Sequence, residues 1–135
     1  MTSPIPQPPA LFSYGFRPFF LFGTLWVAFA MGVWIVTLSG GLTVPSRFEA
    51  TSWHAHAFLF GYLHAVLAGF LLTAVPNWTG RPPLVGGPLA GLFLLWGAGR
   101  VVIFTSQIWP LWVGISIDIA FPILLGAYIL REIIA

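Results

Sequence analysis

The chain has 135 residues, of which 59% are hydrophobic, 17% aromatic and only 6% charged, and its mean hydropathy is +0.96. So apolar a composition excludes an ordinary soluble domain and predicts an integral membrane protein. Five scattered arginines offer no basic patch for nucleic acid, and the absence of cysteine excludes disulfides, iron–sulfur clusters and c-type haem attachment.

The sequence contains four apolar runs of the length that a membrane span requires. A hydrocarbon core needs about 20 apolar residues per helix. The runs cover residues 19–38, 53–75, 88–105 and 109–130. They follow a proline-rich segment, 1–18, which lacks a basic amino-terminal region and is expected to be retained. We therefore predict an all-α fold: one polytopic domain over 1–135, a bundle of four transmembrane helices.

The arginines near the span ends predict the orientation. Arg17, Arg81 and Arg131 fall on one side of the membrane, and Arg47 and Arg100 fall on the other. The positive-inside rule then places both termini in the cytoplasm. In this orientation the second span begins at the outer face.

All three histidines of the chain lie in that second span, which reads WHAHAFLFGYLHAVLAGF from residue 53. Ionisable groups inside a membrane are costly, and neutral imidazole is the commonest metal ligand. His54 and His56 are expected near the outer face, with His64 about 12–15 Å deeper. Neither pair then clamps both sides of one iron. Each imidazole is either a ligand or a partner in an interhelical hydrogen bond.

Small residues mark one face of the same helix. Gly61, Ala65 and Gly69 recur every four residues, a pattern that permits close approach of another helix or a flat macrocycle. At 100° per residue, His54 and His64 are expected to share this broad face, whereas His56 points elsewhere. Packing within the chain and apposition of two copies are both open.

Two further polar residues lie in apolar surroundings. Arg100 and Asp118 are expected at depths that differ by roughly 5 Å, which an arginine side chain can span. One interpretation is a buried ion pair. The other assigns Arg100 to a haem propionate or another anion and leaves Asp118 for a proton path.

Three segments resemble one known family. They are FSYGFRPFF at 12–20, WHAH at 53–56 and GFLLTAVPNWTGRPPL at 69–84. In this order they resemble the amino-terminal part of the NnrS family over nearly the whole chain. The resemblance implies a multi-pass protein of the bacterial inner membrane, associated with haem and copper and linked to nitric oxide metabolism and nitrosative stress.

The resemblance also implies roles for individual residues. The family's HAH motif carries over to His54 and His56 as the metal-binding pair, with haem b as the cofactor and with His64 and Arg100 as further candidate haem contacts. The family pattern continues with Glu-Met where this chain has Ala-Phe at 57–58. Loss of a carboxylate and a thioether argues against copper.

The length of the chain leads to two expectations about partners. Family members have more spans than the four found here, so we expect either a shortened relative or a fragment. A six-coordinate haem would require a ligand from a second chain, supplied by a homo-oligomer or by other membrane subunits.

Two other functions are compatible with the same sequence. The chain could be a cofactor-free accessory subunit that packs against a respiratory or photosynthetic complex. It could also be a small transporter module with a polar path through Asp118 and Arg100. No nucleophile with an adjacent base and no phosphate loop is found, so an independent enzyme is not expected.

Overall fold

A computed structural model describes residues 7–134, and every regular element in this range is helical. The elements are the 3-10 helix η1 (Ala10–Phe12), α1 (Phe16–Leu38), α2 (Ala50–His56), the π-helix η2 (Ala57–Leu63), α3 (His64–Thr79), α4 (Gly86–Phe104) and α5 (Leu111–Ile134). Because α2, η2 and α3 follow one another without a break, they form one rod, and the predicted all-helical bundle of four spans is confirmed.

The second span is longer than the sequence predicts. It covers Ala50–Thr79, whereas a stop was expected before Pro76. Pro76 lies inside α3, and the helix ends only at Gly80, which adopts the left-handed conformation with φ 70°. Proline removes one helical hydrogen bond, but neighbouring helices make this tolerable in membrane spans.

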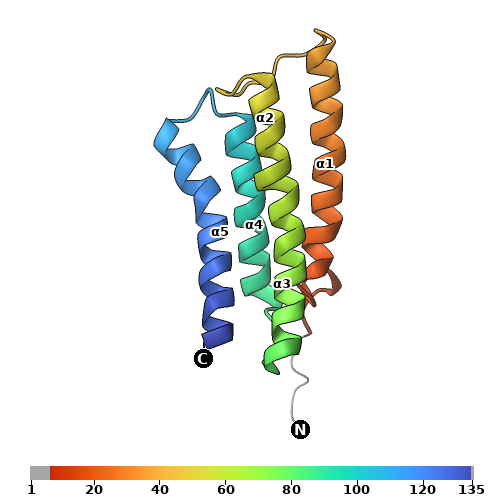
Figure 1. Cartoon of the computed structure of the whole chain (residues 1–135), viewed down its shortest axis with the longest axis vertical. Coiled ribbons are helices and arrows are strands. Elements are labelled where there is room, and N and C mark those ends of the chain that lie inside the picture. The colour runs from red at the N-terminus through yellow and green to blue at the C-terminus, as the bar shows by residue number, and fades with distance from the viewer. Residues whose placement is uncertain (1–6, 135) are drawn as a thin grey trace.

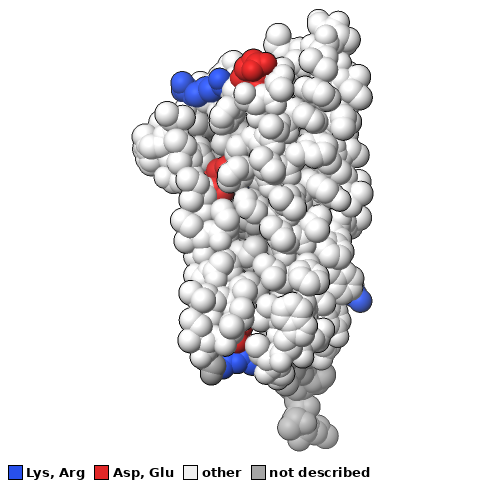
Figure 2. Space-filling model, viewed as in Figure 1, with Lys and Arg blue, Asp and Glu red and all other residues white. Residues whose placement is uncertain are grey.

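The spans lie side by side, and α1 begins at the same end of the bundle at which α5 ends (Figure 1). We call this the terminal end. The opposite end, where α1 stops, α2 begins, α4 stops and α5 begins, is the histidine end. In Figure 2, charged atoms gather mainly at these two ends, and a broad uncharged belt lies between them. Such a belt suits a surface that faces lipid.

Two apolar clusters hold the helices together. The cluster nearer the terminal end is built around Phe19, Trp96 and Phe121, and the cluster at the histidine end includes Trp53 and Ile103. In the first cluster, Phe19 makes edge-to-face contact with Trp96 at a centroid separation of 6.3 Å. Aromatic side chains of α1, α4 and α5 thus pack against one another and against the second span.

The small-residue stripe of the second span faces α1. A methyl group added at Gly61 would collide with the indole of Trp26, and one added at Gly69 would lie 2.5 Å from a ring carbon of Phe20. Ala65 is fully buried beside Gly23 of α1. Since α1 already covers this stripe, apposition of two copies through it does not occur in this fold.

Adding one methyl group to the stripe tests this close packing. We expect Gly61→Ala to destabilise the protein by about 1–3 kcal/mol because the rigid Trp26 indole must move. A Cβ at Gly91 of α4 would meet nothing within 4 Å, so Gly91→Ala is the matched control and should be neutral or slightly stabilising. Thermal unfolding in mild detergent would measure both, and equal effects would contradict the packing.

Candidate functional site

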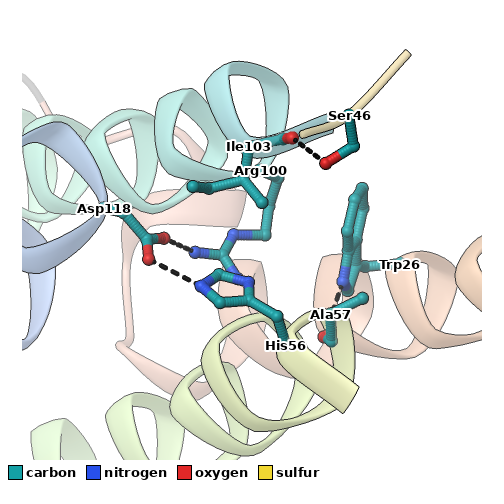
Figure 3. Close-up of polar contacts among 7 residues, drawn as sticks. All are labelled: Trp26, Ser46, His56, Ala57, Arg100, Ile103 and Asp118. Carbon is teal, nitrogen blue, oxygen red and sulfur yellow. Dashed lines mark hydrogen bonds and ion pairs between the residues drawn. The ribbon is translucent and has the colours of Figure 1, made fainter. Parts of the chain in front are cut away.

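Asp118 is the centre of a polar cluster buried between three helices at the histidine end. Arg100 of α4 donates from Nη2 to Oδ1 of this carboxylate, and His56 Nε2 of α2 lies 2.8 Å from its Oδ2 (Figure 3). Arg100 and Asp118 are each only 5% exposed. The ion pair that the sequence allowed is therefore present, and it also includes an imidazole.

Charge balance assigns the state of this cluster. One guanidinium already neutralises the one carboxylate, so a protonated His56 would add an uncompensated charge in a low-dielectric region. We assign His56 as neutral, with its Nε2–H donating to Asp118. The carboxylate then has both oxygens occupied.

Aromatic rings enclose the His56 imidazole. Phe60 stacks on it with centroids 4.5 Å apart and an angle of 6° between the ring planes. Phe48, from the loop that precedes α2, stacks at 5.5 Å. The loop is tied to the end of α4, where Ser46 Oγ donates to Ile103 O at 3.1 Å and Arg47 Nε donates to Ser106 O at 2.8 Å. These contacts hold the ring of His56 in one orientation.

The π-helix directly after His56 is stabilised from both sides. The indole N–H of Trp26 in α1 donates to Ala57 O at 3.0 Å, and that of Trp96 in α4 donates to Gly61 O at 3.0 Å. A π-helix has i→i+5 bonds and is rare, occurring often at functional sites. The two indole N–H groups thus provide hydrogen-bond donors from outside the second span to two carbonyl oxygens of the π-helix.

His54 occupies a different environment from His56. Its imidazole stacks on the Trp34 indole of α1 with centroids 4.0 Å apart and 12° between the planes. Nδ1 of His54 and Nε1 of Trp34 are both buried without a hydrogen-bond partner. Nε2 of His54 makes no hydrogen bond with the described residues and is not among these buried atoms. It is therefore the nitrogen that keeps access to the surface.

His64 lies deeper in the bundle and faces α5. Its ring is 6.3 Å from Phe121 and 5.0 Å from Phe60. The sequence placed His54 and His64 on one face, but one contacts α1 and the other α5. The intervening π-helix explains the difference, because it changes the angular spacing between residues on either side of it.

The residues named as candidate ligands do not form a closed metal site. Within residues 7–134, no group of three or more His, Asp or Glu side chains could hold a metal ion. Arg100 was a candidate contact for a haem propionate. Its guanidinium is paired with Asp118 and is almost inaccessible. Each candidate imidazole therefore stands as a separate donor among the described residues.

Several members of the site carry no sequence signal that would have revealed them. Trp34 lies on another span, so only the fold brings it to His54. Phe48 is close to the histidines in sequence but lies in the preceding loop, where no helical spacing predicts its contact with His56. Phe58 and Phe60 are different, since they follow His54 and His56 at the i+4 spacing that places side chains together on a helix.

Comparison with known proteins gives one match. The family model described as NnrS protein matches residues 10–135. No curated protein and no solved structure matches the chain.

Removing one partner of the buried ion pair should be far more costly than removing both. Asp118→Ala leaves Arg100 charged and unpaired, and we expect a loss of about 3–5 kcal/mol. The double variant Arg100→Met/Asp118→Leu removes both charges and should recover most of that stability. Chemical unfolding in detergent would measure both variants. A double variant as unstable as the single one would show that charge compensation is not what holds this cluster.

Proposed function

The chain belongs to the NnrS family, and from this premise we propose that it is a bacterial inner-membrane protein that binds haem b and acts in nitric oxide metabolism or the nitrosative-stress response. Membership of this family suggests a membrane protein of the nitric oxide response. The four apolar spans support the membrane location. We also propose that both termini lie in the cytoplasm. The positive-inside rule supports this orientation, because three arginines belong to the terminal end and, with Arg100 buried, Arg47 is the one exposed arginine at the other end.

The observation that carries the proposal is the difference between His54 and His56. Nε2 of His56 is occupied by Asp118, whereas Nε2 of His54 is unbonded and accessible. Haem iron is commonly held by one proximal histidine. We therefore propose that His54 would hold the haem iron.

Neighbouring residues would orient this ligand rather than touch the cofactor. Trp34 stacks against the His54 ring and fixes its plane. The cluster of His56, Asp118 and Arg100 fixes the first turns of the second span against α4 and α5. When bound, haem would supply an iron atom able to coordinate nitric oxide.

A haem held by two protein ligands would need another chain. His54 would offer one imidazole nitrogen, and no second histidine lies close enough along the same helix to hold the same iron. A second copy or another membrane subunit would supply the second ligand.

A cofactor-free accessory subunit is the second candidate. It is favoured by the closed cluster around Asp118, which satisfies its own charges without a metal. The same closure disfavours a transport path, because neither Asp118 oxygen is left for a permeating ion.

Optical spectra of the gently purified protein, oxidised and reduced with dithionite, would test the main proposal. We expect a Soret band that is lost in His54→Gly and restored by added imidazole, since free imidazole fills the vacated ligand position. His64→Gln, which removes an imidazole facing α5, is the matched control and should keep the band. Nitric oxide added to the reduced protein should shift the spectrum.

Two results would overturn the proposal. An unchanged spectrum in His54→Gly would show that His54 is not the ligand. A colourless protein that does not take up haem and co-purifies with a stoichiometric membrane partner would establish the accessory role.

A further inference from the structure

We propose that the pocket at the terminal end binds a phosphate group, carried by the headgroup of an anionic phospholipid. The pocket has a volume of about 530 Å³ and lies where the α3–α4 connection, the start of α4 and the last turns of α5 meet. Its polar lining includes Arg81, Arg131, Glu132 and Tyr128. It is remote from the histidines, so the inference does not rest on the proposed haem function.

The charges of the pocket leave it net positive. Glu132 has a side chain only 6% exposed and accepts from Arg131 Nη2 at 2.8 Å, while Arg81 Nη1 lies 3.6 Å from its other oxygen. Two cations and one anion leave a charge of +1. The buried carboxylate thus gathers two guanidinium groups at one place without cancelling both.

Donors remain free for an anionic ligand. Arg131 uses Nε and Nη2 for Glu132, and its side chain is 71% exposed. Nη2 and Nε of Arg81 have no partner among the described residues, and its side chain is 33% exposed. Guanidinium groups present a fork of N–H donors that matches the oxygens of a phosphate.

Part of the wall of the pocket comes from the start of α4. Val85 and Pro88 line it there. Pro82, Pro83 and Pro88 complete the rim, and their fixed φ angles keep this wall preorganised.

The position of the pocket favours lipid over free phosphate. It lies at the ends of three membrane spans, where headgroups of the surrounding bilayer are present at high local concentration. Basic pockets between transmembrane helices on the cytoplasmic side are suited to anionic headgroups. The uncharged belt next to this end of the bundle would contact the acyl chains (Figure 2).

Native mass spectrometry and thermal unfolding in neutral detergent would test the site. Phosphatidylglycerol should be retained and should raise the melting temperature, whereas phosphatidylcholine should do neither. Arg131→Gln and Arg81→Gln should each weaken retention about fivefold. Arg17→Gln is the matched control, because Arg17 is an exposed arginine at the same end that bonds Ala10 O outside the pocket.

A substitution with the opposite effect makes the test sharper. Glu132→Gln keeps the shape of the side chain but raises the charge of the site from +1 to +2, so it should strengthen phosphatidylglycerol retention. Inorganic phosphate that stabilises the protein as much as the lipid does would assign the site to free phosphate and overturn the lipid source. If Arg17→Gln and Arg131→Gln weakened the retention of phosphatidylglycerol equally, the lipid would be held by a general attraction to basic surface residues. That result would overturn the site.

Discussion

A carboxylate inside the bundle sets the arrangement of three of the four spans. Asp118 of α5 receives Arg100 of α4 on one oxygen and His56 of α2 on the other. In a region of low dielectric each of these groups is costly alone, so the helices are stable together only in the register that joins them. α1 does not contribute to this cluster. It is held instead by its aromatic packing and by the bond from Trp26 to the second span.

The π-helix directs His54 and His64 toward different helices. Because η2 begins directly after His56, the residues before and after it no longer follow one helical spacing. His54 reaches α1 and His64 reaches α5. An uninterrupted α-helix would have placed these two imidazoles on a shared face. The indole N–H groups of Trp26 and Trp96 donate hydrogen bonds to η2. They therefore affect the directions of the histidines without contacting them.

The sequence predicted those features that depend on hydropathy and depth, and not those that depend on side-chain direction. The four spans followed from apolar length, and the similar depth of Arg100 and Asp118 made an ion pair one of two interpretations. The continuation of α3 through Pro76 was missed, because proline usually ends helices in water. The stacking of Trp34 on His54 was missed because interhelical contacts have no local signal. The charge gathered at Glu132 was also unforeseen, since Arg81 comes from the α3–α4 connection and reaches Glu132 of α5 only in the fold.

The unsatisfied atoms of the histidine end distinguish its two outermost imidazoles. A buried polar atom without a partner costs free energy, and native proteins keep few of them. In the cluster of His56, Arg100 and Asp118 both carboxylate oxygens are occupied, and Arg100 Nε is the buried atom without a partner, whereas beside His54 two buried nitrogens, one from that ring and one from Trp34, have no partner. A cluster whose carboxylate is fully occupied is suited to holding helices in register. A stacked pair that is not satisfied stands to gain hydrogen bonds from a polar group or water brought in by a neighbouring chain. This difference supports the proposal that His54, and not His56, is the ligand.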